Sequence, residues 1–393
     1  MLILERPRAT GRAERDLFTT AFQFQCVARF QLQLLSQGLG DNDSARFVHD
    51  ETRVHFGMII WVDPQINAIY LAEKWQLSPL GTKFKEVTPV NRILASGVSG
   101  PIGAALLASF EPQSTQIVRL VRGRAQSAAQ VSWDPLAPVS PAAVSGFDAV
   151  VHLAGETVVG RWTEEKKRAI RESRVQGTRN LAAALAQSEA KPRVLVCASA
   201  VGFYGNRGEE LLREESPAGQ GFLSEVCREW EDASRIAAEA GIRTVNIRIG
   251  LVLSAKGGAL ANMLKPFKLG LGGRIGSGQQ WWSWIHVDDI VGGIHHAIGT
   301  GSVAGLGNGL VSGPVNLAAP NPVRNAEFTK VLASVLGRPA FFPVPEFALR
   351  LAFGKMAAEE LLLASQRVEP GKLGASGYAF RFRELRPALE NLV

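Results

Sequence analysis

The chain has 393 residues, of which 46% are hydrophobic and 20% are charged, and its formal net charge is +7. This balance excludes a disordered or fibrous protein and indicates a globular one, long enough for one large or two medium domains. No apolar stretch approaches the roughly 18 to 20 residues that a membrane-spanning helix needs, so we expect no membrane span.

The distribution of charge excludes some classes of partner, and the cysteines exclude some kinds of site. The lysines and arginines form no basic tract, and RNP-type, zinc-finger and helix-turn-helix patterns are missing, so we expect no nucleic-acid partner. A small anionic ligand accounts for the positive excess equally well. Cys26, Cys197 and Cys227 are odd in number and far apart, which argues against a disulfide framework and against a zinc site. The first residues lack an apolar run of signal-peptide length, so we expect a cytoplasmic protein, with import into an organelle left open.

Residues 1–90 differ in pattern from the rest of the chain. Apolar and polar residues alternate over Phe22–Leu34, which predicts a half-buried strand, and a second apolar run follows at Met58–Val62. We therefore expect a small β-rich N-terminal extension. His49 and His55 lack a second cluster of ligands, so they are interpreted as surface residues, and we expect no metal site.

From residue 91 onward, short apolar runs alternate with helical stretches, as is typical of βαβ units around a parallel sheet. The predicted strands are Arg92–Ser96, Gln116–Val121, Ala149–Leu153, Arg193–Ala198 and Thr244–Ile249. The predicted helices between them are Ile102–Phe110, Thr163–Gln187 and Phe222–Ala240. Because the strands are continuously apolar, both faces of the sheet are expected to be covered by helices. The sequence predicts an α/β fold with a doubly wound Rossmann sheet.

A smaller α+β cap is expected after the sheet. We place the nucleotide-binding domain at residues 91–313 and the cap at 314–393, with a strand at Pro314–Ala319. The cap's predicted helices are Ala326–Leu336, Glu346–Phe353 and Ala357–Ala364. The glycine- and tryptophan-rich segment Leu269–Trp284 is interpreted either as a flexible wall over a substrate or as a connection that packs its tryptophans on the cap.

The strongest local motif is the strand at Arg92–Ser96 followed by three glycines and a helix. Gly97 permits a tight turn, Gly100 lets the backbone approach a pyrophosphate, and Gly103 lets the helix pack closely against the strand. The first amides of the helix, near Ser99, Pro101 and Ile102, and the positive end of its dipole then receive the phosphates. Pro101 is tolerated at the first turn but removes one N–H donor. A purely structural glycine turn is the alternative.

The second predicted strand ends in arginines. An NAD-selective site places an acidic residue there to hold the ribose hydroxyls, whereas this chain has Arg122 and Arg124. A guanidinium forms charge-assisted hydrogen bonds with a 2′-phosphate, so the sequence predicts NADP as the cofactor. The alternative is a solvated strand end.

Several motifs together resemble one protein family. With the segments Ser96–Gly103, Val151–Glu156 and Ala198–Gly205, the chain from about residue 91 to 393 is similar to extended short-chain dehydrogenases/reductases. More narrowly, it resembles their atypical epimerase family, in which a C-terminal domain of unknown function follows the NAD(P)-binding, epimerase/dehydratase-like part. The other segments that carry this resemblance are Gly160–Thr163, Arg171–Val175, Leu223–Glu231, Trp284–Asp289, Phe342–Arg350 and Leu362–Val368.

The resemblance implies how a dinucleotide would lie. It places the riboses along three small or apolar residues and the nicotinamide beside the ends of two later strands. The implied contacts are Leu153, Ala154, Gly155, Ala198, Arg248 and Leu251. The small residues among them also have a structural explanation, because they permit tight packing between helix and sheet.

The family resemblance also exposes a gap in the catalytic pattern. Working relatives use a tyrosine and a lysine one helical turn later, and the corresponding positions here are Leu223 and Cys227. A leucine has no proton to transfer and an unperturbed thiol titrates near 8.5, so neither replaces the pair. A further departure is Arg174, where the family pattern would have asparagine.

Four other side chains are candidates for proton transfer on the expected cleft wall: Ser199, Glu156, Tyr204 and His286. Tyr204 has a structural alternative in the tight Tyr-Gly turn. For His286 the alternative is a hydrogen bond near a helix start, with Asp288 or Asp289 as the N-cap. Glu156 would be a base if burial raised its pKa, or would simply hold a backbone N–H.

The sequence leaves two functions open. The first is an NADP-dependent, epimerase/dehydratase-like oxidoreductase that transfers a hydride to or from an unknown small molecule. The second, favoured by the missing tyrosine and lysine, is an NADP-binding regulator that signals through protein partners. Superfamily relatives often pair through helices that match Thr163–Gln187 and Phe222–Ala240, which implies a homodimer.

Overall fold

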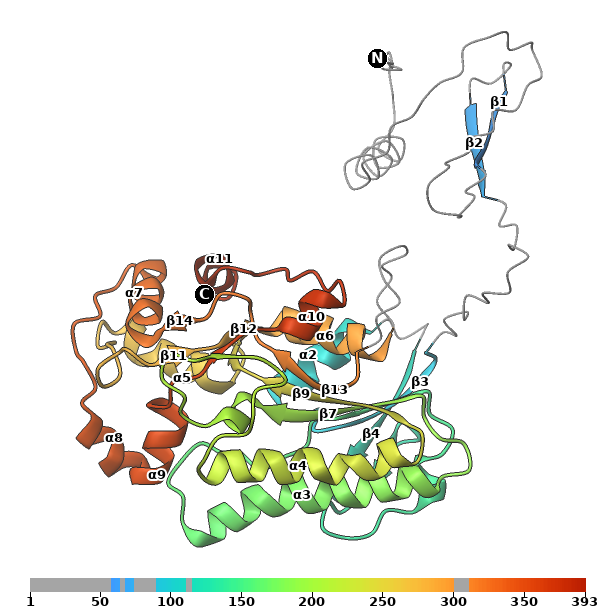
Figure 1. Ribbon diagram of the computed structural model, residues 1–393, viewed down its shortest axis with the longest axis horizontal. Helices are drawn as coiled ribbons and strands as arrows, with labels where there is room; N and C mark the ends of the chain where they lie inside the picture. Colours follow the sequence, from blue (N-terminus) through green and yellow to red (C-terminus); the bar gives the residue numbers. More distant parts are fainter. Residues whose placement is uncertain (1–57, 64–67, 74–89, 111–114, 300–310) are drawn as a thin grey trace. The chain divides into compact units, whose positions relative to one another are not determined.

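A computed structural model describes residues 58–63, 68–73, 90–110, 115–299 and 311–393 (Figure 1). The chain divides into two units, Met1–Lys85 and Glu86–Val393. In the first unit, β1 (Met58–Asp63) and β2 (Ala68–Glu73) form an antiparallel pair, and the apolar run noted at Met58–Val62 lies in β1. The expected strand at Phe22–Leu34 lies outside the described residues.

A seven-stranded parallel sheet forms the centre of the second unit (Figure 1). Its strands, in spatial order, are β13 (Gly313–Leu317), β9 (Arg243–Ile249), β7 (Val194–Ala200), β6 (Ala149–His152), β3 (Arg92–Ser96), β4 (Gln116–Val121) and β5 (Gln130–Ser132). The chain runs outward from β3 to β5 and then returns to β6 on the other side of β3. This reversal is the topological switch point at which doubly wound sheets bind ligands, and the predicted Rossmann fold is confirmed.

Two helical layers cover the sheet, one on each face (Figure 1). On one face, α2 (Pro101–Ser109) and α6 (Val287–Ile298) pack around Leu106, Ile290 and Ile294. On the other, α3 (Glu164–Gln187) and α4 (Phe222–Glu239) lie side by side. Their contacts with the sheet include Leu181, Leu185, Trp230 and Ala237, and each large side chain buried in this way contributes about 1.5–3 kcal/mol.

Local sequence explains where the longest helix begins and ends. The Thr163 hydroxyl accepts a hydrogen bond from the Lys166 N–H at 3.2 Å and caps α3, and Glu164 and Glu165 follow in its first turn. Negative charge at this end complements the helix dipole. α3 ends at Gln187, as predicted.

The remaining elements lie between the strands of the sheet or in the C-terminal region. They are β8 (Leu211–Leu212), β10 (Leu251–Leu253), α5 (Gly258–Lys268), β11 (Trp281–Trp282), β12 (Trp284–His286), β14 (Val323–Arg324), α7 (Asn325–Leu336), α8 (Glu346–Phe353), α9 (Lys355–Ala357), η3 (Ala358–Leu362), β15 (Arg367–Val368), α10 (Gly371–Ala375) and α11 (Leu385–Glu390), with 3₁₀ turns η1 (Pro141–Val144) and η2 (Val201–Tyr204). Short two-stranded pairs join β10 to β12, β11 to β14 and β8 to β15.

Two features differ from the sequence expectations, and a third decides between two of them. The strand expected at the start of the cap, β13, belongs to the main sheet, where it pairs with β9. For the segment Leu269–Trp284 the structure agrees with the second of the two interpretations, because Trp284 is fully buried and Trp282 contacts Phe328 of the cap. The helix expected at Ala357–Ala364 is a short α-helical turn followed by the π-helical turn η3. None of the helices among the described residues is long and apolar enough to cross a membrane.

Candidate functional site

The register of the sheet aligns the carboxyl ends of its central strands along one edge. Ser96 of β3 pairs with His152 of β6, and His152 pairs with Cys197 of β7. Further along, Ala200 pairs with Ile249 at the ends of β7 and β9. The loops that follow these strands therefore emerge together, next to the switch point, and carry the candidate site.

The corner after β3 has the geometry predicted for a phosphate-binding turn. Gly97 has φ +71°, and a Cβ there would lie 2.4 Å from the carbonyl carbon of Leu153. A Cβ at Gly103 would lie 2.4 Å from the Cα of Val98, so only glycine lets α2 pack this closely. At Gly100, the N-cap of α2, a Cβ would meet nothing nearer than the Gly97 carbonyl oxygen at 3.5 Å.

The same corner is accessible. Ser99 and Pro101 are exposed and Ile102 is half-buried. The N–H groups at the start of α2 have no acceptor within the helix. Pro101 has no N–H and therefore offers no donor. An accessible helix start with free N–H groups and a positive dipole end is suited to an anion such as a diphosphate.

The segment after β6 forms the next part of the edge. Leu153 and Ala154 are half-buried and Gly155 is exposed. The guanidinium of Arg174, on α3, covers Gly155: a Cβ there would lie 3.1 Å from the Arg174 Cζ. Arg174 also donates to the Glu156 carbonyl oxygen at 2.8 Å. Sequence reasoning noted Arg174 as a departure from the family pattern and gave it no role; the structure brings its charge to this edge.

Arg122 and Glu156 lie near each other on this edge. Arg122 is exposed, just beyond the end of β4. The Lys166 ammonium donates to Glu156 Oε1 at 2.7 Å and is the main reason that the pKa of Glu156 is lowered; Arg122 and Arg174 add to this effect. From the sequence, Glu156 was a candidate base if burial raised its pKa, with the holding of a backbone N–H as the alternative. The structure differs, because the contact with a cation outweighs desolvation.

Three other predicted residues lie beneath the edge, in a buried hydrogen-bonded network. Ser199 donates to Glu231 Oε1 at 2.7 Å, and Arg248 forms a bidentate pair with the same carboxylate, with both distances 2.8 Å. Arg248 Nη1 also donates to the Tyr204 hydroxyl at 2.9 Å. Burial raises the pKa of Tyr204, and its single proton is taken by either the Asn316 side chain or a backbone carbonyl. Ser199, Tyr204 and Arg248 are thus buried, and their polar groups are engaged with partners within the protein.

His286 also has a structural role. It is the N-cap of α6, where its Nδ1 accepts a hydrogen bond from the Asp288 N–H at 3.0 Å. Its ring is 1% exposed and packs against Phe382, and burial lowers its pKa, which favours the neutral form. The sequence expectation placed one of the aspartates in the cap position; the histidine occupies it instead. Of the other predicted contacts, Ala198 is buried in β7 and Leu251 is half-buried at the start of β10.

Leu223 and Cys227 lie on one face of α4, beside the turn that follows β7. A Cβ at Gly202 would lie 3.4 Å from the Leu223 Cβ and 3.9 Å from the Cys227 sulfur, so both side chains meet the turn after β7. Burial raises the pKa of Cys227 to about 12. Neither side chain supplies a proton to a ligand at neutral pH, in agreement with the interpretation of the sequence.

We expect Cys227 to resist alkylation in the folded protein. A thiol with a pKa of about 12 is ionised to only about one part in 10⁴ at pH 8, and only the thiolate reacts. Incubation with iodoacetamide at pH 8, followed by peptide mass spectrometry, should leave Cys227 unmodified, whereas the same treatment in urea should modify it. Rapid labelling of Cys227 without denaturant would contradict the buried placement.

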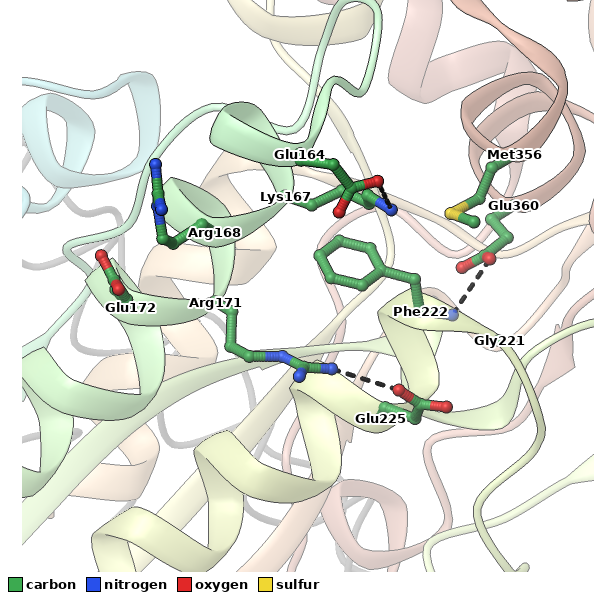
Figure 2. Close-up of a pocket in the computed structure, with 10 residues that line it drawn as sticks. All are labelled: Glu164, Lys167, Arg168, Arg171, Glu172, Gly221, Phe222, Glu225, Met356 and Glu360. Atoms are coloured by element: carbon green, nitrogen blue, oxygen red, sulfur yellow. Dashed lines mark hydrogen bonds and ion pairs between the residues drawn. The ribbon is translucent and has the colours of Figure 1, made fainter.

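Two cavities lie where the start of α4 meets the C-terminal region, and the larger one also touches α3. The smaller, of about 250 Å³, is lined by Gly202, Gly205, Asn206, Gln220, Leu223, Glu359, Glu360, Ala364 and Gln366. The larger and more open one, of about 610 Å³, is shown in Figure 2 and shares Glu360 with the first. Glu360 accepts hydrogen bonds from the N–H groups of Phe222 and Leu223, at the start of α4. Sequence reasoning missed this residue, because no motif marks a contact with a partner 138 positions away.

Comparisons with known proteins agree with this geometry. Residues 93–306 match the model of the NAD dependent epimerase/dehydratase family, and residues 344–392 match a domain of unknown function, DUF1731. An epimerase family protein of Mycobacterium bovis is 39% identical over 302 residues, which cover 76% of this chain and 97% of that protein.

Two solved structures are similar as well. The human epimerase family protein SDR39U1, solved with NADPH, has a TM-score of 0.69 and 34% identity, and the match covers 77% of this chain and 98% of that one. A structure from Corynebacterium glutamicum, described as a nucleoside-diphosphate sugar epimerase, has a TM-score of 0.63 and 38% identity, with 78% of this chain and 58% of that chain covered. On its fold, its glycine corner and these matches, the chain belongs to the NAD dependent epimerase/dehydratase family.

Proposed function

We propose that the chain is an NADP-dependent, epimerase/dehydratase-like oxidoreductase that acts on a small molecule by hydride transfer. The observation that carries the proposal is the corner at Gly97–Gly103, where close backbone contacts require glycine at 97 and 103 and where Ser99 and Pro101 at the start of α2 are exposed. The matching human protein was solved with NADPH, which supports the choice of nucleotide.

The residues at the strand ends fit such a cofactor. The amides after Gly100 would hold the diphosphate, Arg122 the 2′-phosphate, and Leu153–Gly155 the riboses. A bound nicotinamide supplies or accepts a hydride. Arg174, which covers Gly155, adds a fixed positive charge beside this path in a chain that has Cys227 at the position of the family's lysine.

Replacing Arg122 by alanine is expected to weaken NADPH binding about 10- to 100-fold and to leave NADH binding unchanged, because the guanidinium forms charge-assisted hydrogen bonds with the 2′-phosphate only. Nucleotide fluorescence titrations of both proteins measure the effect. Arg124→Ala, which removes the other exposed arginine after β4, is the matched control. Equal binding of the two nucleotides, unchanged in the Arg122 variant, would disprove the selectivity.

A second function is favoured by one specific observation, the inert pair Leu223 and Cys227 on the face of α4. In that case the chain binds NADP as a regulator and signals through protein partners. Incubation with stereospecifically deuterated NADPH and a library of carbonyl compounds separates the two functions. Transfer of deuterium to a product supports the oxidoreductase. If no compound of the library receives deuterium, the regulator is supported. A homodimer through α3 and α4 and a cytoplasmic location stay predictions.

A further inference from the structure

The smaller cavity has an unusual electrostatic character for a family whose similar structures include a nucleoside-diphosphate sugar epimerase. Its lining contains two carboxylates, Glu359 and Glu360, and no lysine or arginine. It lies against Leu223 and Gly202, the point where α4 meets the turn after β7, and so adjoins the edge of the sheet that carries the candidate nucleotide site. The remaining polar side chains of the wall are uncharged amides, including Gln366.

Glu360 is held in a fixed position in this wall. Its Oε1 accepts the Phe222 N–H at 3.0 Å and its Oε2 accepts the Leu223 N–H at 2.8 Å. The carboxylate therefore occupies the positive end of α4, where an anionic group of a ligand would otherwise be favoured. Each carboxylate oxygen offers two lone-pair positions, so each retains one acceptor position for another donor.

Three cations near this wall, Arg350, Lys167 and Arg171, are already paired with carboxylates. Arg350 forms ion pairs with Glu359 and Glu346. In the larger cavity, Figure 2 shows Lys167 paired with Glu164 and Arg171 paired with Glu225. A ligand that carries a diphosphate would place its negative charges against Glu360, and it would have to break these pairs to use Arg350, Lys167 or Arg171 as a counter-charge.

In the lining of the larger cavity as a whole, negative side chains also offset the positive ones. It holds four carboxylates and three cations, namely Glu164, Glu172, Glu225 and Glu360 against Lys167, Arg168 and Arg171. Neither cavity thus presents an excess of positive charge to an anionic ligand.

We propose that the smaller cavity binds the substrate of the nucleotide-loaded protein and selects a small neutral or cationic molecule, whose hydroxyl or ammonium group donates to Glu360. The same cavity excludes nucleoside diphosphate sugars. The cavity's volume of about 250 Å³ is also below the roughly 300 to 1,000 Å³ of pockets that hold drug-sized ligands. This inference rests on the proposed function.

Three carbonyl compounds of similar size and different charge test the proposal: aminoacetone, hydroxyacetone and pyruvate. Their affinities, and that of UDP-glucose, are measured by saturation-transfer NMR on the full chain with NADP⁺ bound. We expect aminoacetone and hydroxyacetone to bind at least about tenfold more tightly than pyruvate, because pyruvate places a second carboxylate beside Glu360. UDP-glucose should give no signal that aminoacetone displaces.

The variant Glu360→Gln removes the charge and keeps one acceptor oxygen for the two N–H groups at the start of α4, so we expect its fold to be retained. We expect it to reduce the preference for aminoacetone over pyruvate to less than about threefold. Glu172→Gln, an exposed carboxylate of the larger cavity, is the matched control and should preserve the preference. If Glu360→Gln fails to fold, Glu359→Gln replaces it, with a smaller loss of preference expected because Arg350 already pairs with Glu359.

Pyruvate or UDP-glucose binding as tightly as the other probes would overturn the inference, as would failure of both aminoacetone and hydroxyacetone to bind. The proposed function is tested separately in the same samples, by the fluorescence titration with NADPH. If the protein binds NADPH but does not prefer aminoacetone and hydroxyacetone over pyruvate, the substrate class alone is refuted. If the protein fails to bind NADPH, both the proposed function and the substrate class are refuted.

Discussion

Replacing Glu231 by alanine is expected to lower the free energy of unfolding by about 3–5 kcal/mol, the cost of leaving a buried charge without its partner. Arg248 is 3% exposed and forms both of its carboxylate contacts with Glu231, at 2.8 Å each. The same substitution also removes the acceptor of the Ser199 hydroxyl. No other carboxylate oxygen hydrogen-bonds to Arg248 among the described residues.

Urea unfolding of the full chain, followed by circular dichroism, measures this effect. Glu239→Ala, also on α4, is the matched control, because Glu239 pairs with Arg235 at a site where both side chains are more than two-thirds exposed. Surface pairs of this kind contribute about 0–1 kcal/mol. Similar losses for the two variants would mean that the Glu231–Arg248 pair is solvated in solution.

The second large effect is expected at Gly97. In Gly97→Ala, the new Cβ would lie 2.4–2.5 Å from the backbone of Leu153 and Ala154, which cannot move aside as a side chain would. The residue also has φ +71°, where alanine is strained by about 1–2 kcal/mol. We expect at least about 3 kcal/mol of destabilisation, and a loss of NADPH affinity of about 100-fold or more as the turn shifts.

Gly160→Ala separates the clash from the backbone strain. Gly160 has φ +116°, and a Cβ added there would meet nothing within 4 Å, so only the strain of about 1–2 kcal/mol should remain. NADPH affinity, measured by fluorescence titration, should be unchanged in this variant. A Gly97→Ala protein that binds NADPH normally would show that the corner does not hold the nucleotide.

The sheet was predictable because its strands are apolar runs, and the helices that cover it have clear boundaries in the sequence. Arg92–Ser96 and Gln116–Val121 match β3 and β4 to the residue, and Glu346–Phe353 matches α8. The strand β5 (Gln130–Ser132) was missed, since three residues without a buried side chain give no periodic signal.

The candidate site was less predictable than the fold, for a different reason. The glycine corner follows from local backbone chemistry and could be recognised from adjacent residues. The partners of Ser199, Tyr204 and Arg248 are set by tertiary contacts, among them the pair between Arg248 on β9 and Glu231 on α4. A sequence shows that these polar residues exist, but not whether they face a cleft or each other.

The position of β13 in the main sheet restricts where the chain can be truncated. Because β13 pairs along β9 from Gly313↔Val245 to Leu317↔Ile249, a polypeptide terminated before residue 313 would leave the backbone amides and carbonyls on that side of β9 without a neighbour. Such an open strand recruits other chains, and aggregation on expression is the usual result. The strand that completes the sheet beside β9 therefore lies in the segment between the two matched regions, residues 93–306 and 344–392, and a fragment cut to the first region alone would lack it.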